Sequence, residues 1–442
     1  MQSEKFPDKG TTNFTEIMHQ TLMSGRTRFF LSIVALLLVM PAAAQTRITS
    51  PYSRFGVGEL MFNQNFRNMG MGGVGIGHRS NQSVNYLNPA SYTSVDSTSF
   101  VFEVTAFSHF YEQQTTAESQ NGNYTSLGNL SFGFPVTRWW GVGLGLKPFS
   151  QVGYKVLNSV VDEQIGTVNH LYEGSGGINQ VFIGNAFRLF EGFSLGVNAS
   201  YLFGNMERHA SLSSDSTGFF LANQIKSDQV NDWHFGLGAQ YEIKLSEERN
   251  LTVGAIYGAA TSIKIRQTET IQRMLPGFTN YDTISYYEGE KGSLYLPAYY
   301  GAGVFGHFNS QWAGGFDIQV QNWEEYKIFD TPGNLNNTYQ FAVGLQHNPS
   351  VQTFSNLFSR LEYRAGFRYG QTYLNINDQA INEFGISFGI GIPIRRTYNG
   401  LNLGFEYGQR GTTDNDLIKE NLYRINISVN IYERWFIRRR FF

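Results

Sequence analysis

Apolar and polar residues alternate along most of the chain after residue 99, with the period of two expected for β-strands. The pattern is clearest near the C-terminal end, where Ile425, Ile427 and Val429 alternate with polar residues. Successive side chains of a strand point to opposite faces, so each such segment has one apolar and one polar face. A membrane barrel with lipid outside and a polar lumen repeats this pattern in segments of about ten residues.

Fourteen segments have the alternation of strands, and an even number of antiparallel strands is typical of such a barrel. Short connections follow the even-numbered segments and long ones follow the odd-numbered segments, which predicts periplasmic turns at one end and outer loops at the other. One connection, 348–360, is longer than this rule expects. The predicted strands are 99–111, 124–135, 141–156, 171–187, 193–208, 228–245, 251–268, 293–308, 312–326, 339–347, 361–370, 381–394, 401–410 and 421–432, and the predicted long loops are 112–123, 157–170, 209–227, 269–292 and 327–338.

The composition favours a thin-walled barrel over a helical enzyme. Charged residues make up 15% of the chain, against about 25% in soluble domains, and aromatic residues are also 15%. The chain has 48 glycines and no cysteine, which excludes disulfides, thiolate metal sites and a cysteine-linked lipid anchor. A net charge of −2 gives no electrostatic reason to expect a nucleic acid partner.

The N-terminal region predicts export. Residues 23–44 have the features of a signal peptide: two arginines, an apolar run too short to span a bilayer as a helix, and a small-residue cleavage site. We expect the mature chain to begin at Gln45, and we interpret residues 1–22 as an extension or a misassigned translation start. After the signal no apolar run is long enough for a membrane helix, so a spanning structure would have to be a closed barrel.

Residues 45–98 differ from the rest because they contain prolines and a glycine cluster but no long alternation. We expect them to form an N-terminal hatch, placed in the lumen or as a periplasmic extension, and we expect residues 99–442 to form the barrel. A barrel of fourteen strands is wide enough to need filling or to conduct water. The hatch motif residues are Gly72, Gly73, Gly75, Asn88, Pro89 and Ala90.

These motifs resemble the hatch of the FadL/TodX family of outer-membrane hydrophobic-compound transporters, in which a glycine-rich stretch precedes an Asn-Pro-Ala motif. The PorV-like proteins of type IX secretion are relatives of that family. One departure is Ser91, which stands where the family usually has a glycine.

The resemblance implies a transmembrane antiparallel β-barrel in the outer membrane of a Gram-negative cell, with passive uptake of small hydrophobic compounds. It further implies capture in an outer pocket, rearrangement of the hatch and exit through a gap in the wall. The alternative is a non-enzymatic subunit that binds protein partners in secretion or assembly, as PorV-like proteins do. The expected partners are outer-membrane lipid, small hydrophobic ligands and proteins of a secretion system, with no cofactor and no nucleic acid.

Charged residues of both signs fall on the polar faces of the predicted strands. A charge that faces lipid is costly, so these side chains are expected to face the lumen. They either pair with one another and with hatch arginines, which would fix the hatch, or they line a ligand path; the close spacing of three of them along one strand favours pairing. The expected network is Glu103, Asp317, Glu362, Arg364, Arg368, Glu406 and Arg424, with Lys147 also facing inward and with Arg54, Arg67 and Arg79 as hatch arginines.

Other chemistry has weak support. Residues 70–75 match the G-x-G-x-x-G pattern of dinucleotide sites, but no βαβ unit surrounds them, so close packing within the hatch is the better interpretation. The histidines form no metal-binding motif. A membrane-embedded hydrolase would need a serine, a histidine and an orienting polar group together, which spacing alone does not indicate. We therefore expect no catalytic residue, no metal and no enzyme activity.

Overall fold

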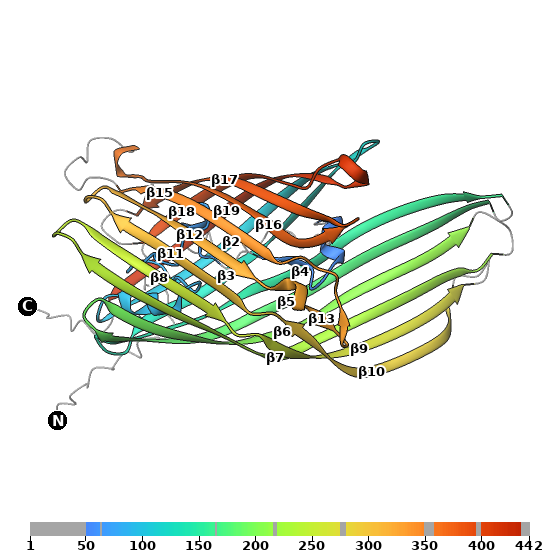
Figure 1. The fold of residues 1–442 in the computed structure, drawn as a ribbon, viewed down its shortest axis with the longest axis horizontal. Coiled ribbons are helices and arrows are strands. Elements are labelled where there is room, and N and C mark those ends of the chain that lie inside the picture. The colour runs from blue at the N-terminus through green and yellow to red at the C-terminus, as the bar shows by residue number, and fades with distance from the viewer. Residues whose placement is uncertain are drawn as a thin grey trace, which may run out of the picture. The chain divides into compact units, whose positions relative to one another are not determined.

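The computed structural model describes residues 50–61, 64–163, 166–214, 219–274, 280–348, 358–394 and 399–434. The predicted signal peptide, the predicted cleavage point and residues 1–22 lie outside these ranges. Among the described residues, no helix is long and apolar enough to cross a membrane. Strands make up most of the described chain (Figure 1).

The strands form one antiparallel sheet that closes on itself, because β19 pairs with β2. Within the described ranges fourteen strands make this wall, two of them built from two consecutive pieces, and the predicted fold class is confirmed. The strands are β2 (Ser99–Gln114), β3 (Ser119–Pro135), β4 (Trp140–Asp162), β5 (Gly166–Phe190), β6 (Phe193–Ser214), β7 (Leu221–Lys244), β8 (Asn250–Gly258) with β9 (Thr261–Met274), β10 (Asp282–Leu296) with β11 (Tyr299–His307), β12 (Trp312–Gln321), β15 (Thr338–His347), β16 (Glu362–Ile376), β17 (Gln379–Pro393), β18 (Gly400–Arg410) and β19 (Lys419–Arg434).

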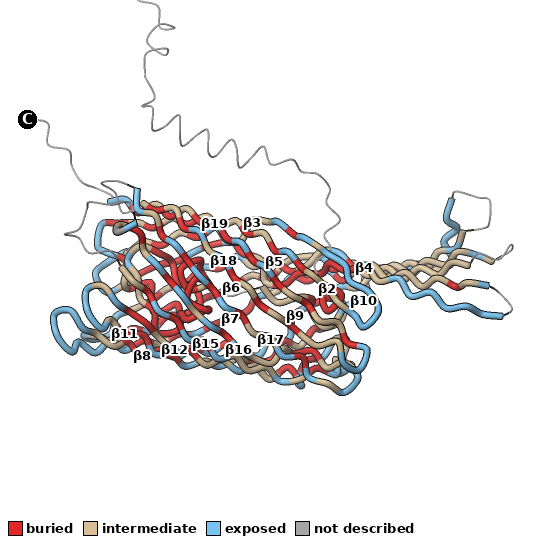
Figure 2. The backbone as a smooth tube through the Cα atoms, turned by 90° about the horizontal axis from the view of Figure 1, so that it is seen from above, coloured by how far each residue is buried: buried red, intermediate tan, exposed pale blue. Residues whose placement is uncertain are grey.

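The alternation along the strands separates a lipid-facing from a lumen-facing side, as predicted. In β19, Ile425 and Ile427 are 43% and 42% exposed, whereas Arg424 and Asn426 are 2% and 3% exposed. Figure 2 shows the same alternation of buried and exposed positions around the wall. A closed barrel with apolar residues outside and polar residues inside is a transmembrane barrel.

Two predicted strands are interrupted, and one is shorter than expected. The segment predicted as 251–268 divides between β8 and β9, and the segment predicted as 293–308 divides between β10 and β11 around Pro297. Proline has no backbone N–H to donate to a ladder, so it favours a break. The strand predicted to reach residue 326 ends at Gln321 and is followed by a short helix.

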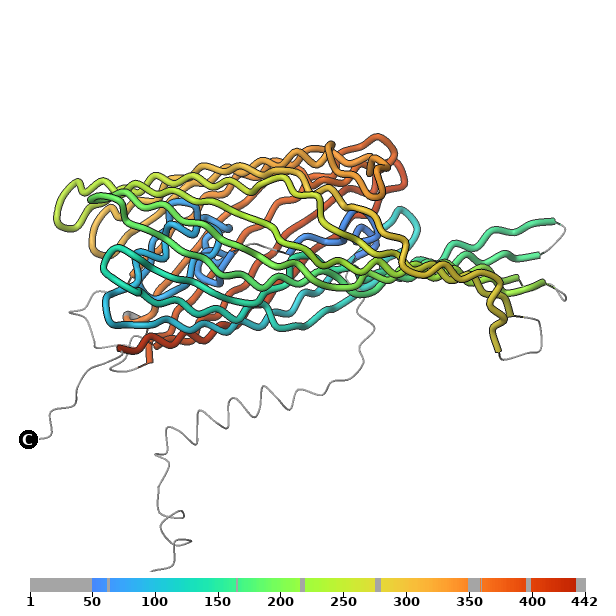
Figure 3. The backbone as a smooth tube through the Cα atoms, turned by 90° about the horizontal axis from the view of Figure 1, so that it is seen from below, coloured from blue at the N-terminus to red at the C-terminus, as the bar shows by residue number. Residues whose placement is uncertain are grey.

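The prediction of long outer loops was wrong for four of the five segments. Residues 112–123, 157–170, 209–227 and 269–292 are mostly paired strand joined by short connections. The outer parts of β4, β5, β6, β7, β9 and β10 continue past the barrel as a sheet, which we call the extension (Figures 2 and 3). A sheet exposed to water on both faces needs no apolar alternation, so its sequence resembles that of a loop.

The remaining elements are short, and the N-terminal ones lie inside the wall, where Figure 3 shows them in blue. This placement puts residues 50–61 and 64–98, which we call the hatch, in the lumen rather than in a periplasmic extension. These elements are η1 (Pro51–Arg54), β1 (Glu59–Leu60), α3 (Phe66–Met69), η2 (Pro89–Ser94), η3 (Trp323–Glu325), β13 (Lys327–Ile328), β14 (Thr331–Pro332), η4 (Phe358–Arg360) and η5 (Asp414–Asp416).

Candidate functional site: a hatch fixed against a seam in the wall

The wall is unevenly paired between β3 and β4. These strands form a ladder only between 130–135 and 141–146, next to the short turn that joins them. Beyond that ladder, within the described ranges, β3 pairs with β2, whereas β4 pairs with β5 and with strand β1 of the hatch. The wall therefore has a seam, which we define as the divergence of β3 and β4 beyond Leu130 and Leu146.

Both strands carry a residue that disturbs pairing where the seam begins. In β3, Gly128 is the extra residue in an irregularity of the β2–β3 ladder. An extra residue bends a strand and increases its local twist. In β4, Pro148 has no backbone N–H, and the β4–β5 ladder shifts its register directly after it. The local sequence thus favours divergence of the two strands at this point.

The start of the hatch occupies the β4 edge that the seam leaves open. Strand β1 pairs antiparallel with residues 150–151 of β4. The Ser50 N–H also donates to the Gly153 carbonyl oxygen, with 3.0 Å between N and O. We call residues 50–61 the strap, because they supply β4 with the ladder partner that β3 does not.

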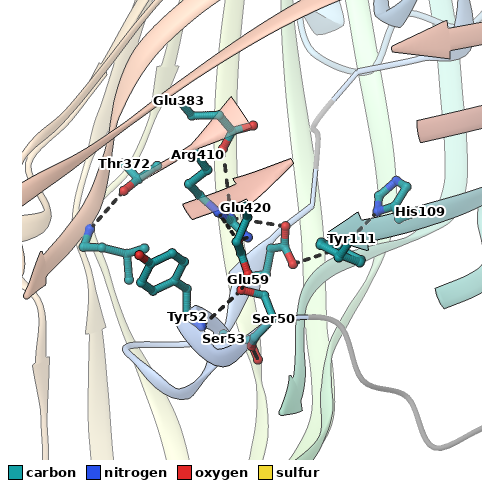
Figure 4. Close-up of polar contacts among 12 residues, drawn as sticks. Ser50, Tyr52, Ser53, Glu59, His109, Tyr111, Thr372, Glu383, Arg410 and Glu420 are labelled. Carbon is teal, nitrogen blue, oxygen red and sulfur yellow. Dashed lines mark hydrogen bonds and ion pairs between the residues drawn. The ribbon is translucent and has the colours of Figure 1, made fainter. Parts of the chain in front are cut away.

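Arg410 of β18 joins the strap to the wall (Figure 4). Its guanidinium donates to the Glu420 carboxylate at 2.6 and 2.8 Å and to the Glu59 carboxylate of the strap at 3.2 Å. The Ser50 hydroxyl donates to the other Glu420 oxygen at 2.5 Å. We call Ser50, Glu59, Arg410 and Glu420 the latch. Removing one partner of a buried ion pair costs several kcal/mol, so the latch holds the strap in place.

Tyr52 strengthens the same contact. Its hydroxyl donates to the Ile418 carbonyl oxygen, and its ring lies 5.6 Å from the Arg410 guanidinium carbon. Burial raises the pKa of Tyr52 to about 12, so the hydroxyl stays protonated and remains a donor at neutral pH.

Part of the predicted charge network forms a second cluster in the lumen. Glu406 accepts hydrogen bonds from Arg368 at 2.9 Å and from Arg424 at 2.5 Å. Glu383, which the sequence analysis did not include, also pairs with both arginines and lies 4.0 Å from Arg410. The lumen cluster and the latch are therefore continuous.

Another predicted group binds the middle of the hatch. Glu362 pairs with Arg364 on its own strand and with the hatch residue Arg67, at 3.1 Å between nitrogen and oxygen. Of the three hatch arginines, Arg67 thus pairs with a predicted lumen carboxylate. Arg79 instead donates to Gln240 at 2.9 Å and lies 3.8 Å from Glu242.

The glycine cluster binds a lone wall carboxylate through its backbone. The N–H groups of Gly75 and Ile76 donate to one Asp317 oxygen at 2.6 and 2.8 Å. The N–H of Gly72 donates to the Ser387 hydroxyl at 2.8 Å. The predicted glycine motif and Asp317 therefore form one contact between hatch and wall.

The Asn-Pro-Ala motif caps a turn and fixes it to the wall. The Asn88 side chain accepts from the Ala90 N–H at 3.2 Å, which caps η2 with Pro89 at its first position. The Asn88 amide donates to the Ala239 carbonyl oxygen at 3.1 Å. The Ser91 hydroxyl, at the position where the resemblance expected glycine, donates back to the Asn88 carbonyl oxygen at 2.8 Å.

Wall glycines leave the space in which the hatch lies. A Cβ at Gly238 would lie 2.1 Å from the Asn88 side-chain oxygen, and a Cβ at Gly366 would lie 2.1 Å from the Gly72 nitrogen. At Gly344 and Gly254 the nearest hatch carbonyl oxygens would be 2.4 and 2.3 Å away. The high glycine content thus reflects close backbone packing between hatch and wall.

Two further predicted inward charges are Glu103 and Lys147. Glu103 is buried, accepts a hydrogen bond from the Thr105 hydroxyl at 3.5 Å and interacts electrostatically with Arg67 and Arg364. Lys147 is buried with its amine 5.2 Å from the centre of the Tyr86 ring. The hatch arginine Arg54 lies over the rings of Phe55 and Tyr172, with 5.1 and 5.8 Å between its guanidinium carbon and the ring centres.

A cavity of about 270 Å³ adjoins the strap and the lumen cluster. Its lining includes apolar side chains of the strap and of β4, such as Leu60, Met61 and Phe149. The lining also includes arginines and glutamates of the two clusters and several other polar side chains. The cavity can therefore contact both apolar and polar groups of a small molecule.

The arrangement defines a class: a plugged transmembrane barrel with the FadL-like fold. The CymD monoaromatic hydrocarbon channel has this fold, with a TM-score of 0.55 and 16% identity over 86% of this chain and 99% of that chain. The Ralstonia pickettii toluene transporter TbuX gives 0.56 and 14% over 88% and 99%, and a Pseudomonas aeruginosa FadL homologue gives 0.56 and 13% over 86% and 100%.

The sequence identifies a narrower family than the shared fold does. The BamG family model matches residues 27–442, and the chain belongs to the BamG family. No curated protein matches the chain in sequence. The expected likeness to FadL/TodX barrels is confirmed for the fold, and a relationship to PorV-like proteins stays a prediction.

Proposed function

We propose that this protein is an outer-membrane channel for the passive uptake of small hydrophobic compounds, which leave the lumen sideways through the seam. The single observation that carries the proposal is the seam itself, filled by the strap instead of by a wall strand. The adjoining cavity has space for a small molecule beside the strap. Movement of residues 50–61 would connect that cavity with the bilayer without unfolding the wall.

The proposal is also supported by similarity of fold to proteins of known structure. The neighbours of known structure include proteins described as a monoaromatic hydrocarbon channel and a toluene transporter. In this proposal the end of the barrel where β2 starts and β19 ends faces the periplasm, and the extension faces the outside of the cell. The contacts described above fix the hatch against the wall, and we infer no catalytic role for them.

A disulfide across the strap tests the proposal. Leu60 and Ser150 are directly paired residues of β1 and β4, and the chain has no native cysteine. In a strain lacking the native protein, the L60C/S150C double variant should take up radiolabelled toluene when reduced and lose uptake when oxidised. The single variants L60C and S150C should be insensitive to oxidation. Undiminished uptake by the oxidised double variant would overturn exit through the seam.

We infer a second function, the binding of protein partners as a non-enzymatic subunit in secretion or assembly, from a different observation. The strands of the extension continue past the barrel as a sheet, which a channel for small molecules does not require (Figure 3). Cross-linking from the extension in intact cells, followed by native mass measurement, should then give one complex of defined stoichiometry. A monomeric protein that retains toluene uptake would contradict this second function.

A further inference from the structure

The extension has two edge strands that differ in chemistry. Its strands are paired in the order β4, β5, β6, β7, β9 and β10, so β4 and β10 form the two edges. One edge of residues 155–161 in β4 pairs with β5, and within the described ranges no strand pairs with the opposite edge. An edge strand presents unpaired N–H and C=O groups that can accept another strand.

The β4 edge lacks the usual protection. Between Lys155 and Asp162 the chain reads Val, Leu, Asn, Ser, Val, Val, with no charge and no proline. Leu157, Val160 and Val161 are 63%, 49% and 80% exposed. Natural edge strands are usually protected by charges, prolines or bulges, because a long apolar edge promotes association.

The β10 edge of the same sheet is protected. It carries Asp282, Glu288, Glu290 and Lys291, all exposed. Its ladder with β9 shifts register twice, between residues 283 and 285 and between residues 287 and 290. Bulges of this kind twist an edge away from further pairing. The sheet is therefore protected against added strands on one edge and open to them on the other.

The backbone direction identifies the groups that would pair. Both the N–H and the C=O of Gly153 point toward the strap, because they bond Ser53 and Ser50. Alternate residues of an antiparallel strand direct both groups to the same side. Leu157 and Ser159 therefore direct their N–H and C=O groups to the open edge, whereas Asn158 directs them toward β5.

We propose that residues 155–161 of β4 form a docking site for an extended segment of a partner protein, added antiparallel as a further strand. The ends of the site carry charges of opposite sign: Lys155 near the barrel, which also forms an ion pair with Glu173 of β5 at 2.7 Å, and Asp162 at the tip. The complementary segment is a β-branched apolar stretch with a basic residue at its N-terminal end and an acidic residue at its C-terminal end. This inference rests on the second function, partner binding, and is independent of transport.

A second copy of the chain fits this edge less well. Two copies in one membrane have the same orientation across it. If each extension keeps its position relative to its own barrel, the β4 strands of the two copies run in the same direction, so their edges could meet only in a parallel arrangement. The end charges of β4 would then face like charges, Lys155 against Lys155. Opposite charges face each other only in an antiparallel arrangement, and like charges directly opposite destabilise a sheet.

The test uses the mature full-length protein in nanodiscs and a short fluorescent peptide that alternates valine and threonine between an N-terminal lysine and a C-terminal glutamate. Binding is measured by anisotropy, and hydrogen exchange reports the amides of 155–161. We expect the peptide to bind and to slow exchange at the odd-numbered positions. The same peptide with alternate amides N-methylated should not bind, because it cannot complete the ladder.

Matched variants distinguish pairing at the β4 edge from non-specific binding of the peptide. Leu157→Lys introduces a charge, and Ser159→Pro removes an N–H that faces the open edge while leaving the β4–β5 ladder. Each should weaken binding by about tenfold or more, equivalent to about 1.4 kcal/mol. Ile284→Lys on β10 should leave binding unchanged. Equal weakening by Ile284→Lys, binding of the N-methylated peptide, no binding by the wild type, or a dimer joined through β4 would each overturn the proposal. Toluene uptake by the same variants is measured in parallel, so that failure of docking is distinguished from failure of transport.

Discussion

The Asp317 carboxylate of β12 accepts the backbone N–H of Gly75 at 2.6 Å, 242 residues away in sequence. Asp317 is 1% exposed, and one of its carboxyl oxygens accepts hydrogen bonds from two hatch N–H groups. The contact joins the two features that the sequence indicated separately, the glycine motif and an inward-facing acid. It also explains why a glycine-rich stretch suits this place, since its backbone must approach the wall closely.

Asp317→Ala should therefore release the middle of the hatch. Two hydrogen bonds from the hatch backbone are lost, each contributing about 0.5–1.5 kcal/mol. We expect amides 72–78 to exchange faster in hydrogen-exchange mass spectrometry, whereas amides of β17 and β18 keep wild-type protection. Asp317→Asn retains an acceptor and should have an intermediate effect. Unchanged exchange at 72–78 in Asp317→Ala would show that this contact does not hold the hatch.

Gly366→Ala should displace the hatch from the wall. The new Cβ would lie 2.1 Å from the Gly72 nitrogen and the Met71 carbonyl carbon, which are backbone atoms that cannot rotate away. We expect lower thermal stability in detergent and faster proteolysis within residues 64–98. Gly306→Ala is the matched control, because its nearest neighbour would be 3.4 Å away. Similar behaviour of the two variants would contradict tight packing of the hatch.

The sequence predicted the barrel well because each lipid-facing strand must alternate. That constraint disappears where strands leave the membrane, so the extension was interpreted as loops. The seam was expected only from the family resemblance, although Gly128 and Pro148 mark its start. An isolated glycine or proline in a strand is not specific enough to locate a divergence of two strands.

Only part of the candidate site was predicted from the sequence, because the direction of a side chain can be inferred only where a strand alternates clearly. Glu362, Arg364 and Arg368 were found because they share one clear strand face. Arg410 and Glu420 lie at strand ends, where the alternation of β18 and β19 begins or stops, so their direction could not be inferred. Their pairing depends on β18–β19 register, in which they are directly opposite.

Arg410→Ala should destabilise the strap strongly. It would leave Glu420 and Glu59 buried without their shared cation, and breaking a buried pair in this way costs about 3–5 kcal/mol. We expect a lower midpoint of urea unfolding and faster hydrogen exchange at residues 50–61. The double variant Arg410→Met/Glu420→Gln removes the charges of both partners and should recover part of the lost stability. A double variant less stable than Arg410→Ala would show that the remaining carboxylates are not the cause.

His78 should make the hatch sensitive to pH. It is 3% exposed and packs edge-on against Phe305, with 4.7 Å between ring centres. Burial, aided by the positive charge of Arg67, lowers the pKa of His78 to about 3, whereas an exposed histidine has a pKa of about 6.5. Between these values the displaced hatch binds a proton that the packed hatch does not. The stability contributed by neutral His78 is therefore complete above about pH 6.5 and is lost as the pH falls toward 3.

Hydrogen exchange of residues 70–90 between pH 7.5 and 4.5, corrected for intrinsic rates, measures this effect. The opening free energy of the hatch should fall with decreasing pH by at most about 1.4 kcal/mol per unit from His78. His78→Phe keeps an aromatic ring against Phe305 but cannot bind the proton, so its opening free energy should depend less on pH. The difference between the two pH slopes isolates His78 from the other acids and bases of the lumen, because those groups are common to both proteins. Identical slopes would show that His78 stays neutral when the hatch opens, and thus that its surroundings remain closed to water in the displaced state.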